Sequence, residues 1–184
     1  NGEWFEFRIY YGIFNASYVT LELENDTIDG NPVFHAKGYG ATTGLARILF
    51  KVEDYYDSYF SQETGLPIWF IRNIYEGGYT KDLEIRFDHE NEIAKINNKK
   101  EKKYQEIKVN PNAQDLISAF YYLRNVKNTS SMKPGESVSI NMFFDSENYL
   151  FKLKYLGVET LDTKFGKIAC RKYIPYVQSG RVFR

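Results

Sequence analysis

The side chains that could perform nucleophilic or metal chemistry are few and widely spaced. His35 and His89 are the only histidines, and Cys170 is the only cysteine. A histidine-assisted nucleophile needs its partner nearby, and a zinc site needs several His or Cys ligands at short spacing. The chain has no Gly-x-Ser-x-Gly, His-x-x-x-His or glycine-rich phosphate-binding segment. We therefore expect no catalytic triad, no metal, no cofactor and no intrachain disulfide.

Paired carboxylates are the remaining route to catalysis. Glycoside hydrolases use two, about 5 Å or about 6.5–9.5 Å apart. Asp54, Asp57, Glu76 and Asp88 lie in or beside aromatic-rich segments, and aromatic side chains also line sugar-binding clefts. However, a chain with 24 acidic residues offers such sets by chance. A carboxylate-based, glycan-acting enzyme is therefore the least favoured of three hypotheses.

Aromatic residues are the most unusual feature of the composition, with 16 Tyr, 14 Phe and 2 Trp among 184 residues. Tyrosine combines an apolar ring with a polar tip, so it suits a half-buried sheet face and also the wall of a ligand pocket. The simpler interpretation is a core with partly buried tyrosines. The sharper interpretation is an apolar pocket rimmed by tyrosines between a helix and a sheet, and its candidate ligand-binding residues are Tyr56, Trp69, Phe70, Tyr79, Tyr121 and Tyr122.

The elements that must position these residues are mostly strands, because apolar residues alternate with polar ones along much of the chain. The segment from Thr43 to Tyr56 fits either a short helix or a strand. Beyond residue 158 we expect further strands, broken at Pro175 and Gly180. Alternation predicts strands at 3–11, 18–23, 34–41, 67–75, 79–87, 92–97, 104–109, 138–144 and 149–155, with a turn over 25–32.

One segment is predicted to be a helix. Asn110 is a natural N-cap, Pro111 fits the first helical position, and the helix should end near 124–125. Phe120 follows the apolar stripe, whereas Tyr121 and Tyr122 are rotated from it by about 100° and about 200°. One of these tyrosines should therefore face a cavity rather than the main core.

These patterns together predict a single β-rich domain over residues 1–184. The expected fold is mainly β: a strongly curved antiparallel sheet or partly closed β-barrel with one main α-helix packed on it. A flat two-sheet sandwich is the alternative. The chain starts at Asn1 without an initiator Met, as it would after removal of a signal peptide, and it stops inside an expected strand at Arg184. We therefore expect either a mature chain that has lost a signal peptide or a trimmed chain, and a truncation at its C-terminus.

Charge and hydropathy exclude two kinds of partner. Twenty-four Lys and Arg balance 24 Asp and Glu, so the net charge is zero with His neutral. Nucleic-acid-binding proteins usually carry a basic excess, so no nucleic-acid partner is expected. No stretch approaches the roughly 18 apolar residues of a membrane-spanning helix, so the protein is not expected to span a membrane.

Several motifs together resemble a known family, the exported bacterial proteins of the domain of unknown function 3108 family. The motifs are Tyr56-Asp-Ser-Tyr59, Thr64-Gly-Leu-Pro67, Arg72-Asn-Ile-Tyr-Glu-Gly-Gly-Tyr79, Phe87-Asp88, Asp115-Leu-Ile-Ser-Ala-Phe-Tyr-Tyr-Leu-Arg124, Phe165-Gly-Lys-Ile-Ala-Cys170 and Gly180-Arg-Val-Phe183. The resemblance implies a signal-peptide-bearing protein of the periplasm or cell envelope of Gram-negative bacteria. It supplies no catalytic residues. A likeness to the half-barrels of lipoprotein carriers is an analogy at the level of fold.

The leading hypothesis is a non-enzymatic, exported cell-envelope protein. It would bind a lipid-like or other amphipathic small molecule, or an apolar one, between sheet and helix. The alternative is a structural or interaction module that pairs an exposed strand edge with an envelope protein partner.

Overall fold

In the computed structural model of the protein, which describes residues 2–12, 14–125, 131–163 and 165–177, the chain is mainly β. The larger sheet contains β1 (Glu3–Tyr11), β2 (Phe14–Ile28), β3 (Asn31–Thr42), β4 (Val52–Ser61), β5 (Pro67–Glu76), β6 (Tyr79–Asp88), β7 (Ile93–Asn98) and β8 (Lys103–Lys108). The smaller sheet contains β9 (Ser137–Phe144), β10 (Glu147–Thr163) and β11 (Gly166–Val177). The helices are α1 (Gly44–Leu49) and α2 (Leu116–Asn125).

Both sheets are antiparallel meanders in which each strand pairs with its neighbours in sequence. The larger sheet has the order β1 to β8, and the smaller has the order β11-β10-β9. Tight turns at positions that need a positive φ make this possible, as at Gly77 (φ 56°) and Gly78 (φ 96°) between β5 and β6. Among the described residues β1 pairs only with β2 and β8 only with β7, so the structure has no closed barrel. The prediction of a mainly β, antiparallel fold is confirmed.

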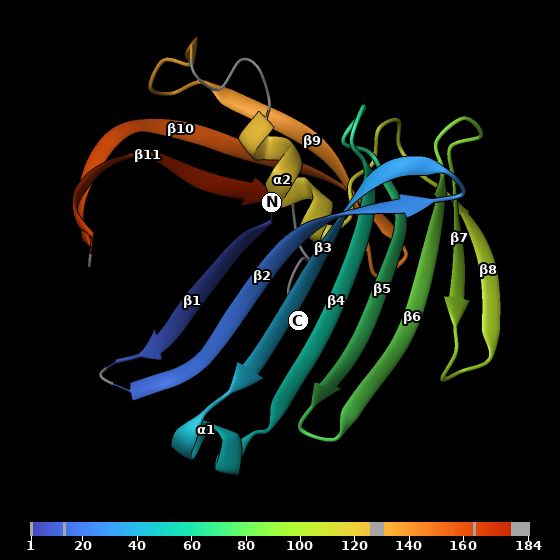
Figure 1. Cartoon of the computed structure of the whole chain (residues 1–184), viewed down its shortest axis with the longest axis horizontal. Coiled ribbons are helices and arrows are strands. Elements are labelled where there is room, and N and C mark those ends of the chain that lie inside the picture. Colours follow the sequence, from blue (N-terminus) through green and yellow to red (C-terminus); the bar gives the residue numbers. More distant parts are fainter. Residues whose placement is uncertain (1, 13, 126–130, 164, 178–184) are drawn as a thin grey trace.

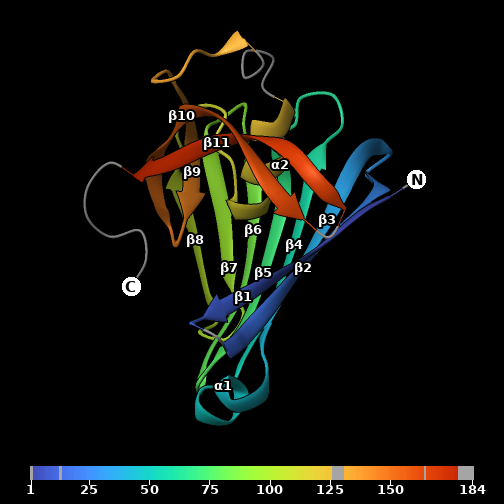
Figure 2. The same ribbon diagram turned by 90° about the vertical axis from the view of Figure 1, so that its left-hand side faces the viewer.

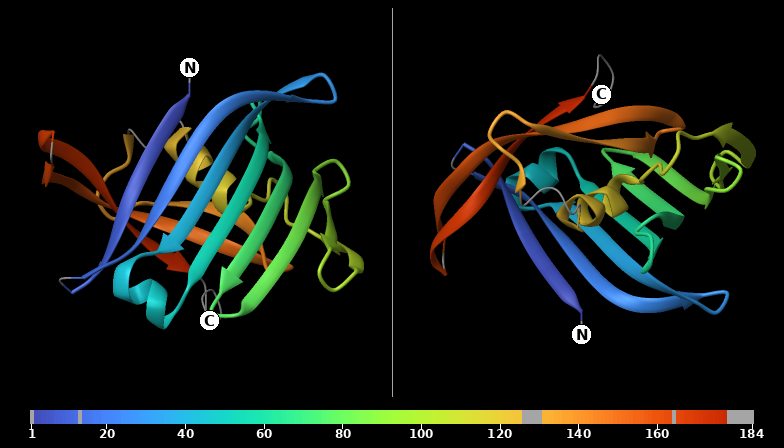
Figure 3. Two further views of the ribbon diagram at one scale, coloured as in Figure 1. Left: turned by 60° about the horizontal axis from the view of Figure 1, so that its bottom comes forward. Right: turned by 90° about the horizontal axis from the view of Figure 1, so that it is seen from above.

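Helix α2 lies between the two sheets, as Figures 1 and 3 show. The residues before it hold it against β9, because the Gln114 N–H donates to the Asn141 carbonyl and the Phe143 N–H donates to the Gln114 carbonyl, both at 2.8 Å. Helix α1 lies at the opposite end of the larger sheet from the three-stranded sheet (Figures 1 and 2). The fold therefore sandwiches one helix between two β layers.

The main core lies between α2 and one face of the larger sheet. It contains side chains from alternate positions of the central strands, because alternate residues of a strand share a face. Phe70, Ile85 and Ile96 are at most 1% exposed, and Ile117 and Tyr121 of α2 pack against this cluster. Phe143 of β9 closes it and is fully buried.

The structure corrects the predicted start of α2. The helix begins at Leu116 rather than at Pro111, and its cap is Asp115 rather than Asn110. The Asp115 carboxylate accepts hydrogen bonds from the N–H groups of Ile117 and Ser118, each at 2.8 Å. Asn110 and Asp115 are both residue types that commonly cap helices. Asp115 is fully buried at the start of α2, and its carboxylate satisfies free N–H groups of the first turn.

Three strand predictions also change. The segment 43–56 contains both alternatives, α1 followed by the first half of β4. The predicted turn over 25–32 reduces to Asp29 and Gly30, because β2 and β3 extend into it. Pro175 does not break β11, since β11 is an edge strand, where a missing N–H costs no ladder bond. The predicted break at Gly180 lies outside the described residues.

The position of α2 between two layers gives Phe120 and Tyr121 surroundings that differ from those expected. Tyr121 is 4% exposed and belongs to the core, whereas Phe120 is 38% exposed. Ile117 and Tyr121, four residues apart, face the larger sheet. The other side of the helix also carries large apolar residues, and it faces the smaller sheet.

Candidate functional site

An apolar cavity of about 520 Å³ lies between α2 and the smaller sheet. Four of its residues come from the helix, and their spacing of three or four places them on one side of it. The remaining residues come from β9, β10 and β11. The lining consists of Leu116, Ala119, Phe120, Leu123, Met142, Phe144, Tyr149, Phe151, Leu153 and Pro175. Carbon atoms therefore dominate the wall, and the only hydroxyl among these side chains is that of Tyr149.

A second cavity of about 430 Å³ adjoins the first, because Phe120, Leu123 and Leu153 line both. It differs in charge, since Arg124 of α2 and Arg171 of β11 contribute to its wall. Each guanidinium stands near aromatic rings: that of Arg124 is 5.4 Å from the ring centre of Phe5, and that of Arg171 is 5.1 Å from the ring centre of Tyr155. The Arg124 guanidinium is also paired with the Glu3 carboxylate, at 2.6 and 2.8 Å. The two cavities together offer an apolar chamber beside one whose wall contains two guanidinium groups.

The side of α2 that faces the larger sheet has a cavity of its own, of about 380 Å³. Tyr121 and Tyr122 line it together with Phe34, Phe60, Asn125 and the segment 61–65. The Tyr121 hydroxyl is buried without a hydrogen-bond partner among the described residues. A water molecule or a polar ligand group in this cavity would satisfy that hydroxyl.

The other four predicted residues lie apart from these three cavities. Phe70 is in the core at 1% exposure, and Tyr56 packs near it with ring centres 6.2 Å apart. Trp69 alternates with Phe70 and so lies on the opposite sheet face, where its ring is 3.9 Å from the Arg86 guanidinium. Tyr79 is 56% exposed beside the β5–β6 turn. Of the six, Tyr121 and Tyr122 line one of these cavities together, and Tyr56 and Phe70 pack against each other in the core.

The residues that prediction missed lie on β9, β10 and β11. Their alternation was visible in the sequence, and it correctly predicts that residues 142 and 144 share a face, as do 149, 151 and 153. The sequence does not reveal which layer that face covers. A helix with apolar residues on two sides was the available signal, because such a helix must be covered on both sides.

A buried polar cluster fixes α2 relative to the larger sheet. The Ser58 hydroxyl of β4 donates to Asp115 Oδ2 at 2.7 Å, while Oδ1 accepts from the first turn of α2. The Asp115 N–H donates to Ser118 Oγ at 3.0 Å, which completes a reciprocal cap. Burial raises the pKa of Asp115 to about 6 despite these hydrogen bonds. The cluster positions the helix that forms one wall of each cavity.

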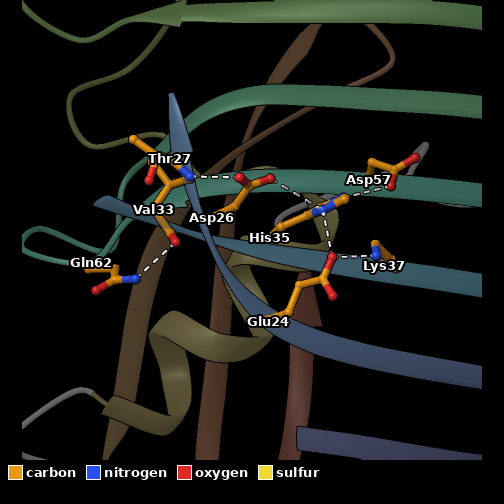
Figure 4. A network of polar contacts seen from close by, with 8 residues as sticks. All are labelled: Glu24, Asp26, Thr27, Val33, His35, Lys37, Asp57 and Gln62. Atoms are coloured by element: carbon orange, nitrogen blue, oxygen red, sulfur yellow. Dashed lines mark hydrogen bonds and ion pairs between the residues drawn. The ribbon is translucent and has the colours of Figure 1, made fainter. Parts of the chain in front are cut away.

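His35 is the centre of a second polar network, on the sheet face opposite the core (Figure 4). Its Nε2 lies 2.7 Å from Asp57 Oδ1, and its Nδ1 lies 3.4 Å from Glu24 Oε1. Lys37 pairs with the same Glu24 carboxylate. The His35 ring also stacks on Tyr59, with ring centres 4.0 Å apart. These contacts join β2, β3 and β4 across the sheet, which is a structural role.

The carboxylates considered for glycan chemistry do not converge. Asp57 belongs to the His35 network, and Asp54, three residues away, lies on the other face of β4. Asp88 holds the turn after β6 through Asn91. Of these four carboxylates, only those of Asp54 and Glu76 interact with each other. Among the described residues no group of three or more His, Cys, Asp or Glu side chains is arranged to hold a metal ion.

Asp54 is 8% exposed and accepts a hydrogen bond from the Tyr75 N–H at 3.2 Å. Burial, with repulsion from Glu76, raises its pKa to about 6. A carboxyl group whose pKa is higher in the folded state than in the unfolded state binds more protons when folded. Its contribution therefore destabilises the fold at neutral pH, and this cost disappears as the pH falls through 6 toward the unfolded value of about 3.9.

We therefore expect Asp54→Asn to raise the free energy of unfolding by about 1–2 kcal/mol at pH 8, and by progressively less toward pH 4. Urea unfolding of the wild type and the variant at several pH values measures this difference. Carboxylates whose pKa is lowered, such as Asp88 and Asp145, change the stability with pH in the opposite direction. Both proteins contain these groups, so their contribution cancels in the difference between the two free energies of unfolding. A difference that is constant with pH would contradict the expectation.

Comparison with known proteins adds a family but no activity. A family model described as "Protein of unknown function (DUF3108)" matches residues 6–184. Neither the curated proteins nor the solved structures give a significant match. Among the described residues no helix is long and apolar enough to cross a membrane.

Proposed function

The chain belongs to the DUF3108 family of proteins of unknown function, and we propose that it binds an apolar or amphipathic, lipid-like ligand between α2 and the smaller sheet. We also propose that the protein is not an enzyme. In this proposal the larger sheet curves around α2 and supports the site. We further propose that the protein is located in the periplasm or cell envelope, and the resemblance to exported bacterial proteins supports this location.

The observation that carries the proposal is the apolar cavity of about 520 Å³. Pockets for small molecules occupy about 300–1,000 Å³ and are lined mainly by apolar and aromatic side chains. Both the volume and the lining fit such a pocket. Transfer of apolar ligand surface from water would drive binding, at about 25 cal/mol per Å².

The adjoining chamber favours an amphipathic ligand with an acidic head. An apolar tail in the first cavity would place a head group beside Phe120 and Leu153, which line both cavities. Arg124 and Arg171 stand in the wall there, and a guanidinium recognises carboxylate and phosphate well because its donors form a planar fork. The Arg124 fork already holds the Glu3 carboxylate at 2.6 and 2.8 Å, so an acidic head group would displace Glu3 or bind beside that pair. A fatty acid or an acidic phospholipid has this chemistry.

An interaction module is the second candidate, and an edge of the larger sheet supports it. Strand β1 is nine residues long and pairs on one side only among the described residues. Such an edge can accept a strand from another protein. Binding of a partner at this edge would leave the apolar cavity unexplained, so we rank it second.

Phe120→Ala tests the site, because this side chain lines both chambers and is 38% exposed. We expect the variant to bind oleate and the apolar dye N-phenyl-1-naphthylamine about tenfold more weakly, since roughly 1.5–3 kcal/mol of apolar contact is lost. Titration by dye fluorescence measures this affinity. Partial exposure of the ring should limit the loss of folding free energy to about 1–2 kcal/mol.

Leu156→Ala is the matched control. Leu156 of β10 is 39% exposed and lines none of the three cavities. Its replacement should leave the affinity for oleate and for the dye unchanged. Equal affinities for the wild type and both variants would show that the ligand does not occupy this cavity.

A further inference from the structure

Helix α1 presents apolar side chains outward rather than burying them. Leu45, Ile48, Leu49 and Phe50 are exposed by 68%, 80%, 85% and 54%, and no residue of α1 is buried. The helix projects from one end of the larger sheet, away from α2 and the smaller sheet (Figures 1 and 2). We call these four residues the α1 tip. An apolar cluster of this kind in a water-soluble fold marks a surface that meets another apolar phase.

The α1 tip is fixed to the neighbouring β5–β6 hairpin. The Gly77 N–H donates to the Lys51 carbonyl at 2.8 Å. The Phe50 ring lies so close to Gly77 that an added Cβ would displace it, and the positive φ of Gly77 (56°) also favours glycine there. The Lys51 ammonium stands 5.0 Å from the ring centre of Tyr75. The tip is therefore held in place next to the hairpin.

A lysine-rich turn lies beside the same hairpin. The turn between β7 and β8 has the sequence Lys99-Lys-Glu-Lys-Lys103. Lys100 reaches the hairpin, because its ammonium donates to the Thr80 carbonyl at 2.9 Å and lies 5.8 Å from the Tyr79 ring centre. Tyr79 itself is 56% exposed. Lys99 pairs with Glu84 at 2.5 Å and Glu101 lies within the turn, so the positive charge that remains comes from Lys100, Lys102 and Lys103. One end of the sheet thus combines an apolar tip, exposed tyrosine and a net positive turn.

We propose that this end of the molecule docks on the surface of a lipid bilayer that contains anionic lipids. Apolar side chains enter the boundary between head groups and acyl chains, tyrosine prefers the head-group level, and lysines bind anionic lipid heads. All three chemistries occur here on adjacent turns. A protein partner would require a pocket to receive the tip, whereas a bilayer accepts a projecting apolar tip without one. The inference is independent of the proposed ligand site.

Flotation with vesicles tests the docking. The full chain should float with vesicles of phosphatidylcholine mixed with phosphatidylglycerol, and bind pure phosphatidylcholine vesicles less tightly. The double variant Ile48→Ser/Leu49→Ser should partition about a hundredfold more weakly, because each of the two buried aliphatic side chains contributes about a factor of ten. Lys100→Gln and Lys102→Gln should each weaken binding to the mixed vesicles about fivefold, and less at high salt.

Val158→Ser/Leu161→Ser is the matched control, because it removes two exposed apolar side chains from β10 instead. This control should float like the wild type. A wild type that does not float, or a tip variant that floats equally well, would overturn the proposal. A tip variant that instead changes the oligomeric state in sedimentation without vesicles would identify the tip as a protein interface and would also overturn it.

Discussion

Asp115→Ala is expected to lower the free energy of unfolding by about 2–4 kcal/mol, the largest effect we expect from one polar substitution. Asp115 is completely buried, and its carboxylate accepts from the N–H groups of Ile117 and Ser118 and from the Ser58 hydroxyl. Alanine leaves all three donors without an acceptor. Urea unfolding followed by circular dichroism measures the loss.

The size of this loss should depend on pH. The pKa of Asp115 is raised to about 6 by burial, so the contribution of this group to the stability of the wild type becomes more favourable as the pH falls from 7 toward the unfolded pKa of about 3.9. The alanine variant has no such group, and the gap between the two proteins should widen on acidification. Asp115→Asn keeps an acceptor oxygen and should lose about half as much. A loss from Asp115→Ala below about 1 kcal/mol would contradict the assigned cap.

Ala119→Phe is expected to abolish binding at the apolar site while keeping the protein folded. Ala119 is 4% exposed on α2 and its side chain lines the 520 Å³ cavity. A phenyl ring at this position would occupy space that the ligand needs, so affinity for oleate should fall more than tenfold. Because the ring fills a void, the free energy of unfolding should change by less than about 1 kcal/mol, whereas overpacking a filled core costs about 1–3 kcal/mol or more.

Ala36→Phe provides the contrast, because Ala36 is fully buried within the main core and lines none of the three cavities. That variant should lose stability strongly or fail to fold. If Ala119→Phe destabilises the protein to the same extent, the space beside α2 is filled in solution. If Ala119→Phe folds and still binds oleate as the wild type does, the ligand lies elsewhere.

Much of the fold is predictable because strand alternation and turn chemistry are local. The boundaries of β5 and β6 follow from alternating apolar residues on either side of Gly77 and Gly78, and prediction places them within one residue. The start of α2 is less predictable. Asn110 and Asp115 are both good N-cap residues, and the choice depends on Ser58, which is 57 residues away from Asp115 in the sequence. Local propensity does not contain that contact.

The candidate site is less predictable than the fold because it depends on which layer covers α2. Aromatic enrichment correctly draws attention to the helix, and Tyr121 and Tyr122 do line a cavity together. Phe120 follows the apolar stripe of the predicted helix, yet this stripe lines the apolar chamber. Trp69 and Phe70 are adjacent in sequence, so they point to opposite faces of the sheet and cannot share one pocket. The packing of the β9–β10 hairpin against α2 is a tertiary contact, and alternation alone does not predict it.

The central claim is that the space between α2 and the smaller sheet holds a lipid-like molecule, and native mass spectrometry tests it most directly. Wild type and Ala119→Phe, purified without detergent, would be incubated with a lipid extract from Gram-negative envelopes and measured intact. We predict an added mass in the range of a lipid on the wild type, released on denaturation and absent from Ala119→Phe. A wild type that carries no added mass, or equal added mass on both proteins, would contradict the claim.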